Sequence, residues 1–329
     1  RDLADWKTIT DFVAVVQTQE RLRTLLLLTI VDIRAVGPGT WNSWKRQLLN
    51  ELYDAAEERL RLGHAQHGRT ERIAAKKAMV AEALGKRGKL VETQGRQLGD
   101  AYWIAEPVDV IALNLAQMDA AQGAPLTVTT EYDAGRGATL VMVLATDHPG
   151  LFYRIAGAIH LAGGNIIDAR IHTTRNGMAV DNFLVQDPLG RPFMEEDQLA
   201  RLKTAIADAL ANRVKLVPQL AARPLARPRM EAFAVRPRVE FDNKASNRFT
   251  VVEISARDRP ALLNRLARAL FESRLIVHSA HIATYGERAV DTFYVTDLLG
   301  EKIDPARAKA VEAALLEAAG EETVEVEVA

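Results

Sequence analysis

The sequence predicts an α+β protein in which an all-helical N-terminal region is followed by two tandem βαββαβ units. Apolar residues recur at helical spacing through residues 1–138. Farther along, residues 139–190 align with residues 250–300, with 20 identities over 51 aligned positions. Both copies alternate β-branched segments with an amphipathic segment, which is typical of the ferredoxin-like arrangement. The duplication therefore predicts two small modules of the same fold.

Five segments of the N-terminal region are expected to be helical. They lie at Thr10–Val16, at Leu22–Val36, around Trp41 and Trp44, at 64–95 and at 97–122. The segment Leu22–Val36 is so apolar that we expect it to be buried, and Gly37-Pro38-Gly39 would end it. The segment 64–95 is rich in Ala, Lys, Arg and Glu, so we expect it to be exposed.

The first unit is expected to contain six elements. They are a strand at Leu140–Thr146, a helix from Pro149 to Ala162, strands at Ile166–Thr173 and Met178–Gln186, a helix at Gln198–Leu210 and a strand at Arg213–Val217. Asp147 is expected to cap the first helix, because its carboxylate can accept hydrogen bonds from free N–H groups. Gly163-Gly164 would end this helix, and Asn176-Gly177 favours a hairpin turn between the next two strands.

The second unit repeats this order and ends at Thr323–Val328, whose strict alternation predicts a strand. The repeat also extends upstream, because Glu131-Tyr132-Asp133 is echoed by Glu240-Phe241-Asp242. Between the units, residues 218–248 are rich in Pro and Arg, which predicts an extended linker.

The composition limits the classes of function. With 42 basic and 43 acidic residues the net charge is −1, so a nucleic-acid-binding protein is not expected. The absence of cysteine excludes disulfides, thiolate metal ligands and cysteine nucleophiles. No apolar run approaches the ~20 residues of a membrane span and the chain opens without a secretory leader, so we expect a cytoplasmic protein without membrane contact. Because the chain begins with Arg1 rather than methionine, we expect it to start inside a longer protein.

In each unit a short turn joins the first strand to the first helix. The turns are Asp147-His148-Pro149-Gly150 and Asp258-Arg259-Pro260-Ala261. In this feature the units resemble ACT domains, small modules that commonly bind amino acids and regulate an attached enzyme. Independently of the resemblance, free N–H groups at a helix start suit an anion such as a ligand α-carboxylate. Gly150 would allow a ligand to approach the backbone closely, Asp147 could pair with an α-ammonium group, and Ala261 makes close approach less favourable in the second unit.

The resemblance implies a set of amino-acid-binding residues. They are Asp147, His148, Gly150, Leu151, Asn165 and Ile166 in the first unit, and Asp258, Arg259, Ala261, Leu262 and Ile276 in the second. Helix capping is the alternative role for Asp147 and Asp258. The strand residues Asp181 and Asp291 are expected to be surface carboxylates. His172 and His281 are likewise expected on exposed strand faces, and His64 and His67 have no companion at metal-ligand spacing.

Three further segments point to one family. They are Leu25–Lys45, Asp100–Trp103 and Val239–Ser246. These segments are similar to the bifunctional PII uridylyltransferase/uridylyl-removing enzymes, and the first is similar to the end of that family's HD phosphohydrolase domain. Two ACT-like units at the C-terminus match the same layout, so the resemblance spans the whole chain. It implies that this is the C-terminal, glutamine-sensing part of an enzyme that transfers UMP from UTP to the PII signalling protein and also removes it.

The resemblance also implies how the chain is divided. Residues 1–63 would be the C-terminal part of an HD-type helical domain, 64–138 a helical connector, 139–217 the first ACT domain, 218–248 the linker and 249–329 the second ACT domain. The parent enzyme would use a divalent metal ion, Mg or Mn, and Asp32 matches the last metal-binding Asp of HD domains. The sequence contains no His-Asp, Gly-Ser or Asp-x-Asp motif, so the other HD ligands and the nucleotide-binding groups are missing. We therefore expect no catalytic residue, and no activity, in this chain alone.

Two alternatives remain open. The chain could be a stand-alone, non-catalytic module that binds amino acids or dimerises through its ACT-like units. It could also be a fragment of a guanosine tetraphosphate hydrolase/synthetase, although that family normally carries one such unit. A homodimer is a further expectation, because ferredoxin-like modules often pair their sheets.

Overall fold

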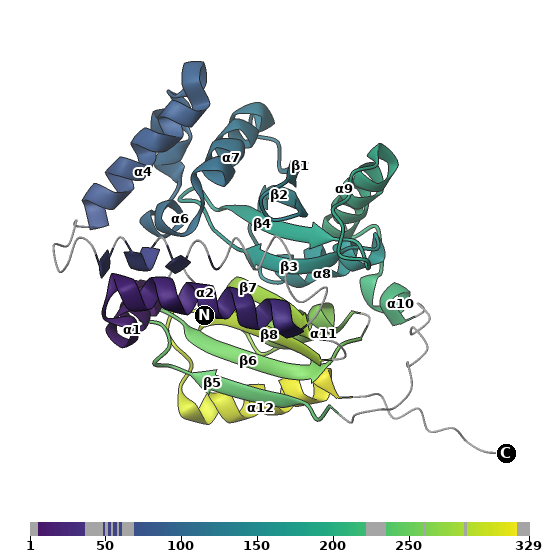
Figure 1. Cartoon of the computed structure of the whole chain (residues 1–329). Coiled ribbons are helices and arrows are strands. Elements are labelled where there is room, and N and C mark those ends of the chain that lie inside the picture. The colour runs from purple at the N-terminus through teal and green to yellow at the C-terminus, as the bar shows by residue number, and fades with distance from the viewer. Residues whose placement is uncertain are drawn as a thin grey trace.

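The structure, a computed structural model, describes residues 6–36, part of 49–60, and residues 69–221, 235–259, 261–285 and 288–320. These residues form an N-terminal helical region followed by two α+β repeats, which confirms the predicted fold class (Figure 1). The helix expected around Trp41 and Trp44, and the strand expected at Thr323–Val328, lie outside the described residues.

The first two helices are α1 (Trp6–Val16) and α2 (Gln19–Val36), which agrees with the prediction. One side of α2 packs against α1 in a small apolar core. On its other sides Leu28 is 61% exposed and Val31 is 64% exposed. The expectation that this helix is buried is therefore wrong for the described residues. The helix is apolar around most of its circumference, whereas its described neighbours cover only one side.

A layer of connector helices follows. It contains α4 (Arg69–Leu84), short helical turns at Gly85–Arg87, Leu90–Thr93 and Gly95–Gln97, α6 (Asp100–Ala105) and α7 (Val108–Ala121). The predicted helical character is confirmed, but α4 is exposed on only part of its surface, since Val80 is fully buried. Ile111 and Leu115 of α7 pack against Leu144 and Val180, so the connector covers one face of the first repeat's sheet.

The described strands form one antiparallel sheet in the order β1-β2-β4-β3-β7-β8-β6-β5 (Figure 1). The strands are β1 (Leu126–Asp133), β2 (Ala138–Thr146), β3 (Asn165–Arg170), β4 (Met178–Gln186), β5 (Arg238–Asp242), β6 (Thr250–Arg257), β7 (Leu275–Tyr285) and β8 (Arg288–Asp297). The repeats join where β3 pairs with β7, and the equivalent residues Ala169 and Ala280 lie opposite each other. An approximate two-fold axis therefore passes through this pair.

The outer strand of each repeat comes from upstream of the predicted unit. β1 pairs with β2 along its whole length, and β5 pairs with β6. This edge position is the one expected for the last strand of each unit, so the predicted strand at Arg213–Val217 is wrong. The chain there leads into α10 (Leu216–Ala221) instead. The sequence did contain evidence for these edge strands, because the similarity between the repeats extends upstream: Glu131-Tyr132-Asp133 and Glu240-Phe241-Asp242 end β1 and β5.

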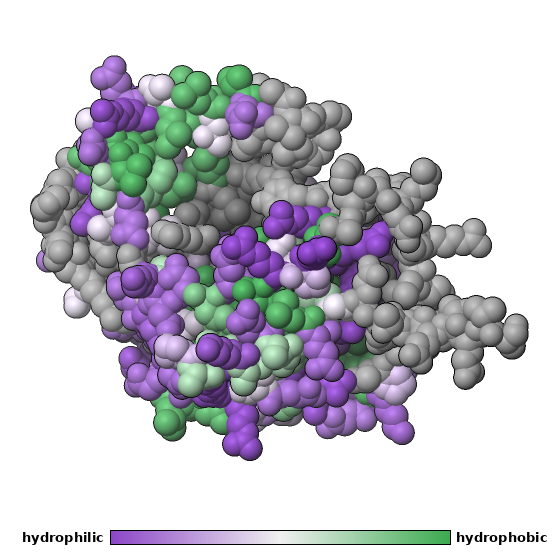
Figure 2. Space-filling model, turned by 90° about the horizontal axis from the view of Figure 1, so that it is seen from below, coloured by the Kyte–Doolittle hydropathy of each residue, from purple (hydrophilic) through white to green (hydrophobic). Residues whose placement is uncertain are grey.

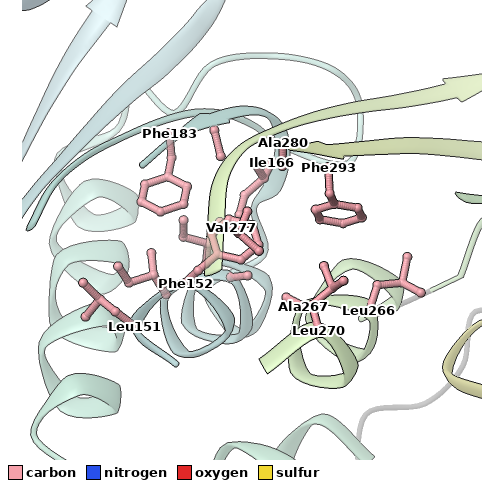
Figure 3. Close-up of a cluster of buried hydrophobic side chains, with 14 of the residues drawn as sticks. Leu151, Phe152, Ile166, Phe183, Leu266, Ala267, Leu270, Val277, Ala280 and Phe293 are labelled. Atoms are coloured by element: carbon pink, nitrogen blue, oxygen red, sulfur yellow. The ribbon is translucent and has the colours of Figure 1, made fainter. Parts of the chain in front are cut away.

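Four helices cover the other face of the sheet. They are α8 (Leu151–Leu161), α9 (Glu196–Leu210), α11 (Leu262–Glu272) and α12 (Pro305–Ala319). The equivalent rings of Phe183 and Phe293 are fully buried beneath these helices (Figure 3). At the contact between α8 and α11, Asn264 Nδ2 donates a hydrogen bond to the Tyr153 carbonyl oxygen at 2.7 Å. A Cβ at Gly157 would lie 2.7 Å from Asn264 Nδ2, so the two helices approach closely only because this residue is glycine.

The surface carries scattered apolar residues. Figure 2 shows the lower face, on which hydrophilic residues surround smaller apolar patches. Leu189 and Leu299 are 74% and 86% exposed in equivalent turns after β4 and β8. Among the helices that the structure describes, none combines the length and the apolar character needed to cross a bilayer.

Candidate functional site

Each repeat presents the start of a helix after a left-handed turn. Helix α8 begins at Leu151 after Gly150, whose φ is 87°, and α11 begins at Leu262 after Ala261, whose φ is 60°. Among the described residues, no side chain caps either helix start. N–H groups in the first turn of a helix have no partner within the helix. Both starts therefore offer backbone donors to an external acceptor.

Asp147 does not cap α8 as expected. Its Oδ2 accepts a hydrogen bond from Thr173 Oγ1 at 2.5 Å, and its backbone N–H donates to the Gly177 carbonyl oxygen at 3.1 Å. The N–H of Leu151 donates to the carbonyl oxygen of His148 at 3.1 Å, so a tight turn separates Asp147 from the helix. The carboxylate consequently lies exposed beside the turn rather than beneath the helix start.

The second repeat keeps the same turn without a glycine. A left-handed conformation costs a non-glycine residue about 1 kcal/mol, so Ala261 is strained where Gly150 is not. Burial raises the pKa of Asp258, although the N–H of Arg259 donates to its carboxylate and opposes the shift. Arg259 Nη2 donates to the Ala318 carbonyl oxygen at 2.8 Å, which holds this side chain against the end of α12.

Helices α8 and α11 pack against each other in opposite directions, so each helix start faces the other repeat. The ring of Phe271, near the end of α11, lies 5.2 Å from the ring of Tyr153 between centroids. A Cβ on Gly150 would lie 3.2 Å from Phe271. The first helix start therefore faces the end of α11 and the beginning of β7, where Ile276 is 39% exposed. The approximate two-fold axis places the second helix start beside the beginning of β3, where Asn165 is exposed.

The remaining predicted binding residues divide into two groups. Leu151, Ile166 and Leu262 are buried in the apolar core below the turns. His148 is half-buried within its turn, with Nδ1 2.9 Å from the Pro149 carbonyl oxygen. The structure thus brings the polar predicted residues to the turns and uses the apolar ones to support those turns.

Sequence reasoning missed the environment of two carboxyl groups. Asp181 is 0% exposed and Asp291 is 2% exposed, so the expectation of surface carboxylates is wrong. The strand alternation could have predicted this burial, because Asp181 shares a face of its strand with Ala179 and Phe183, which lie in the core. Burial and the neighbouring carboxylate of Asp147 raise the pKa of Asp181 well above its usual value. Burial and the carboxylate of Asp258 likewise raise the pKa of Asp291 to about 8.

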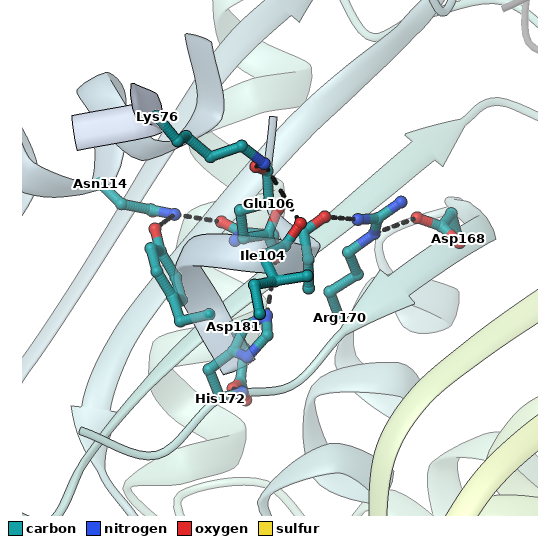
Figure 4. Close-up of polar contacts among 11 residues, drawn as sticks. Lys76, Ile104, Glu106, Asn114, Asp168, Arg170, His172 and Asp181 are labelled. Atoms are coloured by element: carbon teal, nitrogen blue, oxygen red, sulfur yellow. Dashed lines mark hydrogen bonds and ion pairs between the residues drawn. The ribbon is translucent and has the colours of Figure 1, made fainter. Parts of the chain in front are cut away.

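A polar network occupies the opposite face of the sheet. Figure 4 shows the part of it that joins the connector to the first repeat. His172 Nε2 lies 2.8 Å from Glu106 Oε1. Asp168 Oδ1 lies 2.7 Å from His281 Nδ1 of the second repeat. Arg170 lies between these pairs, with Nε 3.5 Å from Asp168 Oδ2. Both histidines are therefore partly buried and paired, and the expectation of exposed strand faces is wrong.

Glu106 is the most buried charged group of this network, with 1% of its surface exposed. Burial alone would raise the pKa of its carboxyl group. The hydrogen bond from His172 and the charge of Arg170 outweigh that effect and lower the pKa to about 2. Lys76 Nζ donates to the Glu106 carbonyl oxygen at 2.8 Å, which attaches α4 to the same point.

Asp32 does not form a metal site with the described residues. Its side chain is exposed on α2. In the described part of the chain, no group of three or more His, Asp and Glu side chains is arranged to hold a metal ion. A divalent ion needs several such ligands, so Asp32 alone does not fit it.

A large groove lies away from the helix starts. It measures about 800 Å³ and is lined by α7, the end of α4 and the turn between β1 and β2. Its buried cation, Arg136, is paired with Asp133 and lies 3.5 Å from Asp109. The buried cation of this groove is therefore already paired within the chain, and we place the candidate site at the helix starts.

No protein-family model matches the chain. The chain is 77% identical over 325 residues to a bifunctional uridylyltransferase/uridylyl-removing enzyme of Novosphingobium aromaticivorans, covering 98% of this chain and 36% of that protein. The proteins of the same name from Erythrobacter litoralis and Zymomonas mobilis are 67% and 50% identical, covering 98% and 97% of this chain and 35% of each relative. The chain belongs to this family. The resemblance found in the sequence is thereby confirmed.

The bifunctional uridylyltransferase/uridylyl-removing enzymes are much longer than this chain, which spans 35–36% of the length of these three relatives. A crystal structure of aspartate kinase from Synechocystis is similar to 55% of this chain and 26% of that one, with a TM-score of 0.30 and 17% identity. A similarity at this level carries no argument about fold or function.

Proposed function

We propose that this chain is the C-terminal regulatory part of a bifunctional uridylyltransferase/uridylyl-removing enzyme and that it binds glutamine where the two repeats meet. The observation that carries the proposal is the duplicated helix start, with uncapped N–H groups beside an exposed or partly buried aspartate. Backbone N–H groups and the positive end of a helix attract a carboxylate. An adjacent aspartate attracts an ammonium group, so the pair suits the two charged groups of a free amino acid.

The packing of the repeats supports a regulatory role for such a site. A ligand at the first helix start would contact residues of both repeats, because Phe271 lies over Gly150. A ligand that binds one arrangement of two packed units more tightly shifts the population toward that arrangement. Glu106 of the connector contacts His172 of the first repeat, and Asp168 of the first repeat in turn pairs with His281, so the connector reaches the second repeat through the first.

The activities of the whole protein belong to the same proposal. The parent enzyme would transfer UMP from UTP to the PII protein when glutamine is scarce and remove it when glutamine is plentiful. Its Mg or Mn ions would be held by ligands outside this chain together with Asp32, the one metal ligand that the resemblance assigns here, and the chain alone would be inactive. The missing His-Asp, Gly-Ser and Asp-x-Asp motifs support this last point.

Isothermal titration calorimetry of the purified chain with L-glutamine tests the binding proposal. We expect saturable binding that Asp147→Ala weakens at least tenfold in the first site and Asp258→Ala weakens in the second. Asp119→Ala is the matched control, because Asp119 is an exposed aspartate on α7. Absence of L-glutamine binding to the wild-type chain would refute the proposal. Equal weakening by all three substitutions would refute the location of the site.

The proposed homodimer has a separate test. Analytical ultracentrifugation with and without glutamine measures whether two copies associate. A monomer at all concentrations would exclude a dimer of this chain and leave the binding proposal untouched.

A further inference from the structure

Each repeat places a buried carboxyl group next to its loop aspartate. We propose that Asp181 with Asp147, and Asp291 with Asp258, form two acid pairs that bind the ammonium group of the ligand and release a proton as they do so. This inference rests on the proposed binding of an amino acid at the helix starts. It adds two binding residues and a coupling between ligand uptake and proton release.

The first pair is defined by the sheet. Asp181 of β4 lies opposite Val143 of β2, and β2 ends one residue before Asp147. The side chain of Asp181 is on the face of the sheet that α8 covers, between Ala179 and Phe183 of the core. Its Oδ1 accepts the backbone N–H of His172 at 3.3 Å. Its Oδ2 is buried and has no hydrogen-bond partner among the described residues.

The second pair repeats this arrangement. Asp291 of β8 lies between Ile254 of β6 and Ile282 of β7, and its Oδ1 is also buried without a partner among the described residues. A buried carboxyl oxygen without a partner is unfavourable in a folded protein. Most aligned positions of the repeats differ, yet both keep this feature beside the helix start. A role at the helix start accounts for both copies, whereas a purely structural role would be expected to satisfy both oxygens of each carboxyl group.

Among the described residues, the charged groups that act on the two strand carboxyls are few. Around Asp181 they are Asp147 and His172, whose ring is engaged by Glu106, while β2 contributes the apolar Val143. Around Asp291 they are Asp258 and the adjacent Arg259, while β6 and β7 contribute the isoleucines opposite it. The pKa of Asp291, raised to about 8, means that this carboxyl is largely protonated near neutral pH in the free protein, and burial together with Asp147 raises the pKa of Asp181 in the same direction.

The proton balance of binding follows from these charges. An ammonium group at Asp147 brings a positive charge next to the protonated Asp181, which favours its ionised form. The O–H bond of Asp181 breaks, the proton passes to solvent and the freed carboxylate accepts an N–H of the ammonium group. The ligand keeps its own protons, so up to about one proton per occupied site leaves the protein. The same steps apply to Asp291 and Asp258.

Calorimetry in buffers of different ionisation enthalpy measures this proton. L-glutamine is titrated into the full chain at pH 7 in phosphate and in Tris. We expect the binding enthalpy to differ between the buffers in proportion to the protons released. Asp181→Asn and Asp291→Asn keep the side-chain shape but cannot ionise, so each should remove the release from its own site and weaken that site. Asp119→Asn is the matched control, and circular dichroism checks the fold of every variant.

The outcomes separate this inference from the proposal beneath it. Binding to the wild type with the same enthalpy in both buffers refutes proton release and leaves glutamine binding intact. Unchanged proton release in the double variant Asp181→Asn/Asp291→Asn refutes the assignment to these residues. Failure of the wild type to bind glutamine refutes the proposed function itself. Carbon-13 NMR titration of the aspartate carboxyls in the free chain is a second measurement, and two ordinary titrations for Asp181 and Asp291 would also overturn the inference.

Discussion

Replacing Asp291 by asparagine should remove a large part of the pH dependence of the second repeat's stability. Burial and the nearby Asp258 raise the pKa of Asp291 from 3.8 to about 8. Each pKa unit corresponds to about 1.4 kcal/mol, so a shift of this size amounts to roughly 6 kcal/mol. The folded state binds the proton more tightly than the unfolded state. The stabilisation is therefore complete below about pH 4 and is lost as the pH rises toward 8.

Asparagine is neutral in both states, so the variant lacks this dependence. We expect Asp291→Asn to match the wild type near pH 4 and to exceed it by several kcal/mol near pH 8. Hydrogen exchange of the β8 amides, measured at several pH values and corrected for intrinsic exchange rates, reports the stability of this strand. Asp119→Asn is the control for the loss of an exposed carboxylate. Parallel pH profiles for the wild type and Asp291→Asn would refute the reasoning, because they would mean that Asp291 is ionised in the folded state.

Three other substitutions test the surroundings of the candidate site. Gly150→Ala should destabilise the chain by about 2 kcal/mol more than Gly163→Ala in urea unfolding. Both glycines have positive φ, but only at Gly150 would a Cβ lie 2.7 Å from the Tyr153 ring. Equal losses of stability would show that the ring moves away freely. Ala261→Gly should relieve the left-handed strain and stabilise α11 by up to about 1 kcal/mol in thermal unfolding, and a lowered midpoint would contradict this. Glu106→Gln should lower the free energy of unfolding by about 1–3 kcal/mol at pH 7. The difference from the wild type should shrink as the pH falls toward 2, since the lowered pKa of Glu106 stabilises the fold only while this carboxyl is ionised. Unchanged hydrogen exchange of α6 and α7 would contradict the role of this contact.

The sequence predicted the elements of the repeats well because their signals are local. The alternation in Met178–Gln186 and the glycines after α8 depend on residues within a few positions. The edge strand was missed because its position depends on a competition between distant segments. β1 and the segment Arg213–Val217 would both fit beside β2, and only the full-length pairing with β1 decides between them.

The candidate site likewise combines features that depend on local sequence, which could be predicted, with features that depend on packing, which could not. The turns after Asp147 and Asp258 were found from sequence, because proline and glycine at fixed positions mark a helix start. The burial of Asp181 was missed, since a lone aspartate in a strand is exposed far more often than it is buried. The contact of Phe271 with Gly150 was beyond sequence reasoning, because it requires knowledge of how the repeats pack.

The joining of the repeats explains why the two helix starts need not be equivalent. A two-fold arrangement of identical units would make two equal sites, and the pairing of Ala169 with Ala280 preserves that geometry in the backbone. The side chains break the symmetry, because Gly150 takes its left-handed turn without strain and Ala261 does not. The polar network breaks it further, because Glu106 contacts the first repeat through His172, whereas the second repeat joins the network through His281. Under the proposed function, a ligand at either start would act on a shared sheet, but its effect would reach the connector through different side chains.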